Sequence, residues 1–326
     1  MTSRENYLKI YRHEIPDYVP GEDPFDFIPA PGEHGADGMP AGSVGTDWFG
    51  VSWTVTKAVG MDAGTPTPGL HVMNDMSEWP DKKDCIPSKE FLDTFDWKGF
   101  CNMFTKNWNR EERISYFWLP AGFFERMHHL MPFEEAVYAF YDEPEYCEEY
   151  LDALLEYKKY VMKKIKEYAN PDVLIFFDDY GATTGMFFTE DMWVQFIAPR
   201  LKQIIDYAHE LGYIFEMHSC GYVEPVIKYL VDMGIDALQP LQALNNVKYV
   251  KETFGDKIVI HGGITASDLV GLNVSHERLV EKVQECVDIC APGGNFIVML
   301  SECGERAPEV SEAFRKALNA AGWEYR

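Results

Sequence analysis

The 326-residue chain has no run of 18 or more apolar residues, and its first seven residues contain no apolar stretch. A transmembrane helix needs about 20 mostly apolar residues, and a signal peptide needs an apolar core. We therefore expect a protein that neither spans a membrane nor carries a secretory signal, and we place it in the cytoplasm.

Positive charge is scarce. The chain has 29 Lys and Arg against 53 Asp and Glu, which gives a formal net charge of -24. Because such a surface repels a phosphate backbone, we expect no nucleic-acid partner. The charge could steer a basic partner towards the protein, but a solvated acidic surface is the simpler interpretation.

Two other common sequence features are missing. Neither a GxGxxG nor a GxxxxGK[ST] pattern occurs, so no glycine-rich phosphate loop is indicated. A disulfide framework is also unexpected, because the seven cysteines are odd in number and widely scattered. The thiols should therefore be reduced, and reduced thiols can bind metal ions.

Aromatic residues, by contrast, are plentiful. The chain has 8 Trp, 18 Tyr and 21 Phe, and six of the Trp lie within the first 118 residues. Most of them should be core residues. Because ligand pockets favour aromatic walls, some are expected to line a pocket for a flat organic substrate.

From about residue 110, short apolar runs alternate with longer helical patterns. The predicted strands are 114–119, 173–177, 213–217, 235–238, 258–260 and 295–300. The predicted helices are about 142–168, 189–211, 224–233 and 275–290, one that ends near residue 254, and a last one that begins at Pro308. This alternation implies a parallel sheet. Five or more repeats in a chain of this length favour a (β/α)8 TIM barrel over an open sheet.

The first 110 residues do not follow this alternation. They are rich in Pro and Gly over 16–40 and 60–69, and only 51–56 suggests a strand. We expect an irregular N-terminal extension that packs over the barrel and helps to shape its pocket. No internal repeat or linker marks a second domain, so residues 1–326 are predicted to form one domain.

Polar residues end several of the predicted strands. They are Asp178 and Asp179, His218, Gln239, His261 and Cys303. Because the carboxyl ends of the strands form the active face of a TIM barrel, these side chains are expected to surround one pocket.

Within that set, His218 and Cys220 predict a zinc site. Side chains two residues apart on an extended segment point the same way, and Cys303 from a remote loop can complete the ligand set. One imidazole and two thiolates suit zinc, and three protein ligands leave a fourth position for water or substrate. Glu302, next to Cys303, is a candidate fourth ligand in the resting state. The alternative is a buried histidine beside two unpaired core cysteines, but the convergence of strand-end residues favours a metal.

Four more residues are candidates for acid–base chemistry. Glu216 should share the inward face of His218, where it orients the imidazole, accepts a proton or is simply a hydrogen-bonded carboxylate. Asp178 and Asp179 alternate in direction, so one should face the pocket and act on the substrate, unless it caps a turn. His261 precedes two glycines and suits a structural role better.

Five segments carry a resemblance to a known family. They are 47–53 (DWFGVSW), 177–181 (FDDYG), 217–221 (MHSCG), 261–264 (HGGI) and 302–304 (ECG). On these segments, which follow the family's order and span about residues 45–320, the chain resembles the uroporphyrinogen decarboxylase superfamily. Within it, the chain resembles the zinc- and corrinoid-dependent methyltransferases.

The resemblance implies a function. The His-x-Cys pair with a distant Cys is similar to the zinc motif of methylcobalamin:thiol methyltransferases, whereas 47–53 is more similar to the first methyltransferases of demethylation systems. We therefore expect the O-demethylase component that moves a methyl group from an O-methyl donor, such as a methoxylated aromatic compound, to cobalt. Trp48 and Trp53 would stack on the donor. The chain has no Asp-x-His-x-x-Gly motif of its own, so the corrinoid (cobalamin) would be carried by a partner, a corrinoid protein.

Three other functions stay open. A methylcobalamin:thiol methyltransferase would use the same zinc to hold a substrate thiolate. A uroporphyrinogen decarboxylase is less well supported, because the Arg-Gln-Ala-Gly-Arg stretch that grips the substrate's carboxylates is absent. A corrinoid- or tetrapyrrole-binding regulatory protein would carry a structural zinc in a closed four-ligand site.

Overall fold

A computed structural model describes residues 1–35, 39–58, 61–265 and 274–326. Over these residues the main sheet has seven parallel strands, which lie side by side in the order of the chain. The strands are β1 (Asp26–Pro29), β5 (Ser115–Leu119), β6 (Val173–Phe177), β9 (Ile214–His218), β10 (Ala237–Leu241), β11 (Val259–Gly262) and β12 (Phe296–Val298).

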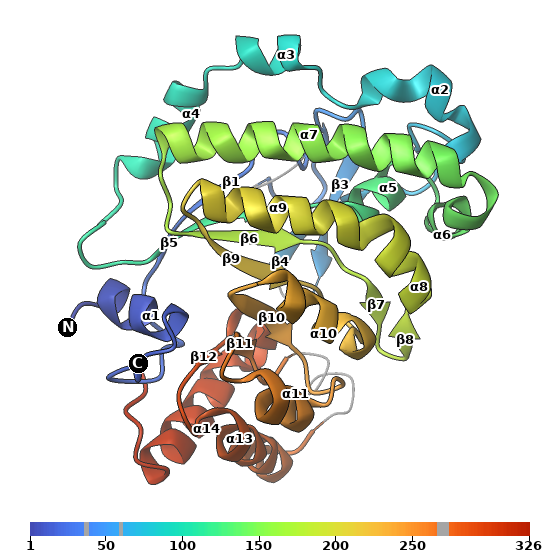
Figure 1. Ribbon diagram of the computed structural model, residues 1–326. Coiled ribbons are helices and arrows are strands. Elements are labelled where there is room, and N and C mark those ends of the chain that lie inside the picture. The colour runs from blue at the N-terminus through green and yellow to red at the C-terminus, as the bar shows by residue number, and fades with distance from the viewer. Residues whose placement is uncertain (36–38, 59–60, 266–273) are drawn as a thin grey trace.

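The sheet curls, and its helices lie on the outside, as in a TIM barrel (Figure 1). Near the open edge, the backbone N–H of Val298 in β12 donates to the carbonyl of Pro20, 2.9 Å away, just before β1. The predicted α/β class with a parallel, barrel-like sheet is confirmed. An eighth strand is not found in the part of the chain described above.

Helices follow the strands and cover the outer face of the sheet. They are α5 (Phe124–Leu130), α6 (Phe133–Asp142), α7 (Pro144–Tyr168), α8 (Glu190–Met192), α9 (Ala198–Glu210), α10 (Glu224–Met233), α11 (Val247–Phe254), α13 (His276–Cys290) and α14 (Ala307–Ala320). Helices α7 and α9 pack side by side over the sheet (Figure 1). Within the described ranges, no helix has both the length and the apolar character required to cross a membrane.

The helix α7 shows how sequence pattern becomes packing. Pro144 stands in its first turn, where a missing N–H costs little. Buried residues recur every three or four positions, as at Leu151, Leu154 and Leu155, so one stripe of the helix faces the core.

The predicted helix over 189–211 is interrupted. Thr189 caps α8, because its side chain accepts a hydrogen bond from the N–H of Met192. A π-helical segment, Trp193–Ile197, then separates α8 from α9. Gly212 follows α9 with a φ of 78°, a conformation that glycine adopts without strain and that stops the helix.

The N-terminal region is more ordered than we expected. It contains α1 (Ser3–Tyr11), the antiparallel strands β2 (Val44–Thr46), β3 (Ser52–Ala58) and β4 (Met61–Pro66), and the helices α2 (Trp79–Lys82), α3 (Lys89–Thr94) and α4 (Trp97–Thr105). Of these, only β3 was predicted. The expectation of few elements here was wrong, because short segments rich in Pro and Gly carry weak periodicity. In addition, β1 belongs to the main sheet.

The helix α1 closes the amino end of the barrel. Its Arg4 pairs with Asp172, directly before β6, at 2.6 Å. Its apolar side chains Tyr7, Ile10 and Tyr11 enter a buried cluster formed with residues of the strands. The strand residues of that cluster include Tyr116, Val173, Ile175, Ala237, Val259 and Ile297. Side chains of α1 thus fill the interior of the sheet at the amino ends of the strands. The carboxyl ends are left for the candidate site.

Candidate metal centre

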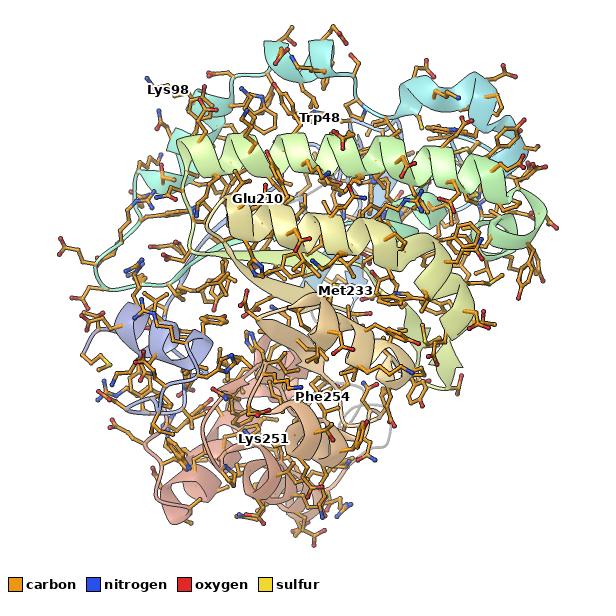
Figure 2. All side chains as sticks on the ribbon, viewed as in Figure 1. Trp48, Lys98, Glu210, Met233, Lys251 and Phe254 are labelled. Carbon is orange, nitrogen blue, oxygen red and sulfur yellow. The ribbon has the colours of Figure 1, made fainter. Side chains whose placement is uncertain are left out.

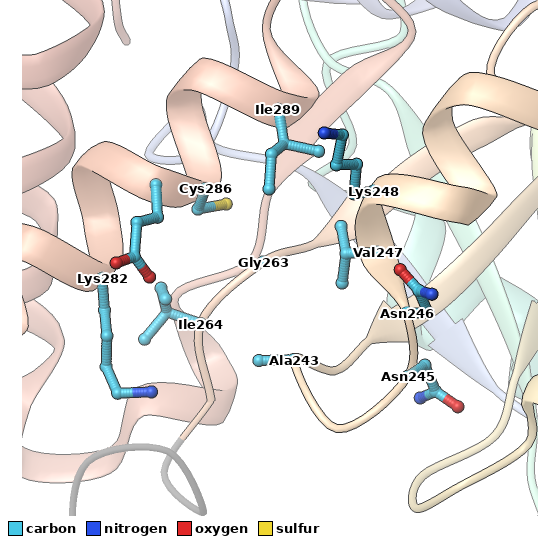
Figure 3. A pocket seen from close by; sticks show the side chains of 11 residues that line it. Ala243, Asn245, Asn246, Val247, Lys248, Gly263, Ile264, Lys282, Cys286 and Ile289 are labelled. Carbon is cyan, nitrogen blue, oxygen red and sulfur yellow. The ribbon is translucent and has the colours of Figure 1, made fainter.

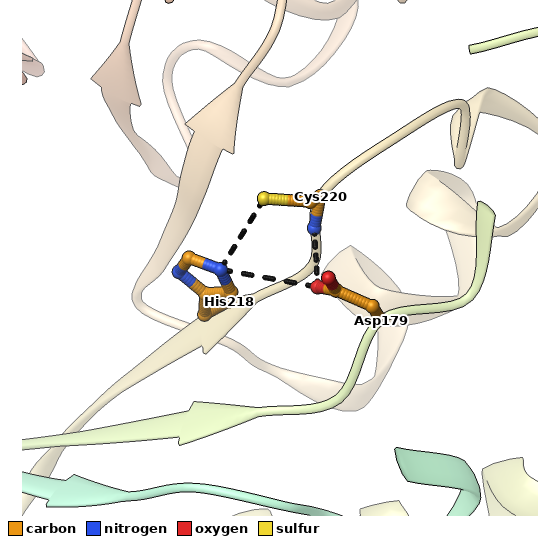
Figure 4. A group of neighbouring side chains, drawn as sticks. All are labelled: Asp179, His218 and Cys220. Carbon is orange, nitrogen blue, oxygen red and sulfur yellow. Dashed lines mark hydrogen bonds and ion pairs between the residues drawn. The ribbon is translucent and has the colours of Figure 1, made fainter. Parts of the chain in front are cut away.

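Three side chains meet where β6 and β9 end: Asp179, His218 and Cys220 (Figure 4). Their ligand atoms all lie within 4.8 Å of one another. The Nε2 atom of His218 is 3.5 Å from the Sγ atom of Cys220 and 3.8 Å from Oδ1 of Asp179. Asp179 and Cys220 are partly exposed, whereas His218 is 8% exposed.

Local backbone geometry brings these residues together. In the sheet, His218 is the register partner of Phe177 in β6, so Asp179 follows two residues beyond that pairing. The N–H of Cys220 donates to Oδ1 of Asp179 at 2.6 Å and ties the two loops together. Gly221 has a φ of 82°, and a Cβ atom there would lie 1.9 Å from the carbonyl oxygen of Gly181. The chain can therefore turn this tightly after Cys220 only with glycine.

The donor set fits a zinc ion. Zinc bonds of about 2.0–2.3 Å in a tetrahedron place neighbouring ligand atoms about 3.3–3.6 Å apart. The distances from His218 Nε2 to Cys220 Sγ and Asp179 Oδ1, 3.5 and 3.8 Å, are close to that spacing. An imidazole, a thiolate and a carboxylate are all zinc ligands, and three of them leave a position open.

Cys303 is not brought into this group. It lies in the 3-10 segment Ser301–Arg306 after β12, fully buried, and its Sγ atom is 3.3 Å from the carbonyl oxygen of Ile264. Its thiol is thus turned towards the loop after β11, and Asp179 occupies the third place that the sequence assigned to Cys303. The side chain of Glu302, the candidate resting-state ligand, lies outside the described residues.

Asp178 and Asp179 have separate roles. Asp178 is fully buried and accepts hydrogen bonds from the backbone N–H groups of Phe123, Phe124 and Glu125, at 2.8, 3.3 and 2.9 Å. Burial raises the pKa of Asp178 to about 6, against the lowering effect of these hydrogen bonds. Asp178 therefore caps the start of α5, which was its alternative role, and of the two carboxylates only Asp179 lies in the cluster.

Glu216 is the centre of a buried hydrogen-bond network. It receives hydrogen bonds from Tyr11 and Gln239, and the Nδ1 atom of His261 lies 3.3 Å from its Oε2 atom. Burial raises the pKa of Glu216, but the charge of His261 and the hydrogen bonds from His261, Tyr11 and Gln239 outweigh it, so the pKa is lowered. Gln239 also connects to His218, whose Nδ1 atom is 3.3 Å from Oε1 of the amide.

The structure gives both predicted substrate-stacking residues a packing role. Trp53 is 2% exposed, and its indole N–H donates to Asp47 at 3.0 Å. Trp48 packs against aromatic rings of the N-terminal helices, Phe91, Phe95 and Trp97. In Figure 2 the labelled Trp48 lies well apart from the labelled Met233 at the end of α10. Neither indole belongs to the Asp179–His218–Cys220 cluster, and their stacking on a donor stays a prediction.

A cavity of about 260 Å³ lies between α11 and α13, next to the loops that follow β10 and β11 (Figure 3). Asn245, Gly263, Ile264 and Cys286 are among the residues that line it, but the three residues of the cluster are not. Because none of the three residues lines it, this cavity is separate from the candidate metal centre. Its volume is also below the range of about 300–1,000 Å³ that is usual for ligand pockets.

Sequence reasoning missed one residue of this site and the role of another. Gln239 was placed among the strand-end residues around the pocket, but its contact with His218 was not predicted, and Tyr11 was not recognised at all. A polar residue in register with His218 could have indicated Gln239. No signal in the sequence indicates that Tyr11 reaches Glu216, 205 residues away.

Comparison with protein families gives one match: the family described as Uroporphyrinogen decarboxylase (URO-D) matches residues 122–318. The matched segment contains all three residues of the cluster and the Glu216–Gln239 pair. Comparison with curated proteins finds no match.

Among solved structures, a methyltransferase from Methanosarcina mazei is similar in fold, with a TM-score of 0.67. The alignment covers 97% of this chain and 99% of that protein at 15% sequence identity. A structure described as IOLI protein with a binding zinc atom aligns over 74% of this chain and 86% of its own, with 11% identity and a TM-score of 0.40. At these identities the first likeness concerns the fold alone, and the second carries no argument.

Proposed function

Since the chain belongs to the uroporphyrinogen decarboxylase family, we propose that it is a zinc-dependent methyltransferase. It takes a methyl group from an O-methyl donor, a methoxylated aromatic compound, and passes it to the cobalt of a corrinoid protein. In this proposal the enzyme is the first methyltransferase of an O-demethylase system, and the corrinoid protein is the methyl acceptor.

The observation that carries the proposal is the Asp179–His218–Cys220 cluster. The two distances from His218 Nε2 to the other ligand atoms are close to those of a zinc site. The cluster lies at the carboxyl ends of the strands, where active sites of TIM-barrel enzymes are built. The fold likeness to a methyltransferase agrees with this activity.

His218, Cys220 and Asp179 would hold the ion. When bound, zinc supplies Lewis-acid stabilisation of the negative charge that develops on the ether oxygen as the methyl group leaves. His218 would hold the ion through Nε2, since its Nδ1 faces Gln239. Oδ1 of Asp179 also accepts a hydrogen bond from the N–H of Cys220, which keeps the two loops together. In the resemblance to the family, the third ligand is Cys303 in place of Asp179.

The test is direct. The zinc-loaded protein is incubated with reduced corrinoid, either free cob(I)alamin or candidate corrinoid proteins, and with a panel of methoxyarenes, methylamines and thiols. Methylation of cobalt by a methoxyarene, seen in the cobalt absorption spectrum and lost in His218→Ala, is the expected result. Methylation without zinc contradicts the proposal. Activity confined to thiols with methylcobalamin would identify a thiol methyltransferase that uses the same metal site.

A further inference from the structure

A chain of hydrogen bonds runs through the sheet interior to the candidate metal ligand His218. It starts at Tyr11 in α1, passes through Glu216 in β9 and Gln239 in β10, and ends at His218. Tyr11 is 6% exposed, Gln239 is 2% exposed and Glu216 is fully buried. Water therefore does not compete for these contacts, and the orientation of each group depends on its hydrogen-bond partner.

This series of hydrogen bonds has a defined donor-to-acceptor direction. A carboxylate oxygen accepts hydrogen bonds, so the Gln239 amide must present its NH2 group to Oε2 of Glu216. The carbonyl oxygen of the same amide then faces His218, 3.3 Å from Nδ1. An oxygen there requires a proton on Nδ1, and a neutral imidazole with that proton has its lone pair on Nε2. Nε2 is the nitrogen that faces Cys220 and Asp179.

Tyr11 is the other end of this series of hydrogen bonds. It donates to Oε1 of Glu216, while Gln239 and His261 contact Oε2. The two oxygens therefore have separate partners, and the carboxylate cannot rotate without losing some of these contacts. Because Tyr11 belongs to the helix that closes the amino end of the barrel, α1 is coupled to the opposite end of the sheet.

We propose that Tyr11, Glu216 and Gln239 form a positioning relay that keeps the proton of His218 on Nδ1 and leaves Nε2 ready for a metal ion. The relay rests on the proposed function in so far as His218 is a metal ligand. It adds three positioning residues outside the Asp179–His218–Cys220 cluster and connects the N-terminal helix α1 to the site.

The test uses the apoprotein and metal binding, not catalysis. In ¹⁵N spectra of histidine-labelled apoprotein, with the His218 signals identified by their loss in His218→Ala, the wild type should show the Nδ1–H tautomer. Gln239→Leu should shift the population towards Nε2–H. It should also weaken zinc binding about 10–100-fold, the usual effect of losing a group that supports a metal ligand. Zinc affinity is measured by competition with a chromophoric chelator.

Tyr11→Phe removes one hydroxyl and should change the tautomer and the affinity in the same direction, by less. Its matched control is Tyr116→Phe, because the Tyr116 hydroxyl lies 3.5 Å from that of Tyr11 but is one step outside the relay. Tyr116→Phe should behave as wild type. The proposal is overturned if Gln239→Leu keeps the wild-type tautomer and binds zinc within twofold of wild type, or if Tyr11→Phe and Tyr116→Phe have the same effect. Both readouts are independent of methyl transfer, so failure of the relay and failure of the proposed function are distinguishable.

Discussion

At the scale of single residues, two adjacent carboxylates show how position decides role. Asp178 has no exposed surface and accepts three backbone hydrogen bonds at the start of α5. Asp179 is partly exposed and lies against His218 and Cys220. Because side chains alternate along an extended segment, one residue serves the fold and the next serves the site.

The ligand set can be decided by metal content. Cys220→Ala and Asp179→Ala should each retain much less than one zinc per chain, because two remaining ligands hold zinc poorly. Cys147→Ala, which changes a buried cysteine of α7, is the control and should keep its zinc. Elemental analysis after dialysis gives the result, and full zinc in Asp179→Ala would remove Asp179 from the set. Loss of zinc in Cys303→Ala would show that Cys303 joins the site when metal is bound.

At the scale of elements, a buried group of four charges joins the N-terminal region to the helices. Arg126 of α5 contacts Glu33 and Asp47 at 2.7 Å each, and Lys158 of α7 contacts Glu33 at 2.8 Å. All four side chains are completely buried. Two positive and two negative charges balance, so each ion has a partner where water is absent.

Removing one charge from this group should lower the stability of the fold. Lys158→Met leaves Glu33 with one partner in place of two, and we expect a loss of about 3–5 kcal/mol in the free energy of unfolding, as for other broken buried ion pairs. Lys164→Met is the control in the same helix, since Lys164 pairs with Glu167 at 3.9 Å near the surface. It should cost less than about 0.5 kcal/mol. Equal urea denaturation midpoints for the two variants would contradict a stabilising role of the buried group.

A second connection between elements should depend on pH. His209 in the last turn of α9 lies 2.8 Å from Asp236, just before β10. Its hydrogen bond to Asp236 raises the pKa of His209, against the effect of burial. Its stabilising contribution is therefore complete below the unfolded pKa of about 6.5 and is lost as the pH rises through the folded value.

His209→Ala should therefore cost more stability at pH 5.5 than at pH 9. The difference should be at most about 1 kcal/mol, because the pair is partly exposed. Urea unfolding of wild type and variant at both pH values measures it. The same loss at both values would show that the pair contributes no charge-dependent stability.

At the scale of the whole molecule, one apolar core joins the N-terminal region to the barrel. Phe49, Trp53 and Trp79 belong to the same buried cluster as Tyr150 and Leu154 of α7. A chain of 326 residues can bury a large core without help from a metal. The candidate zinc site lies at the edge of this core, at the ends of two strands.

Removing the metal should consequently leave the fold intact. After chelation we expect an unchanged far-ultraviolet circular dichroism spectrum and a single cooperative thermal transition. The midpoint temperature should fall only by the amount that corresponds to the free energy of zinc binding to the folded protein. Methyl transfer should stop and return when zinc is added. Loss of helical signal on chelation would show instead that the ion is structural.

Several features could be read from the sequence alone. Apolar runs at regular intervals predicted β6 at residues 173–177, as the structure has it, and the alternation of strands with helices predicted the parallel sheet. The position of His218 and Cys220 at a strand end could also be predicted, because strand direction and side-chain alternation are local properties.

The tertiary structure decided the rest. Whether Asp179 or Cys303 lies beside His218 depends on how the loops after β6 and β12 fold, and no local pattern encodes that. The contacts of Gln239 with His218 and of Tyr11 with Glu216 join residues 21 and 205 positions apart. Periodicity shows which face of a strand is buried, but only the packing of the whole chain determines which buried groups meet across it.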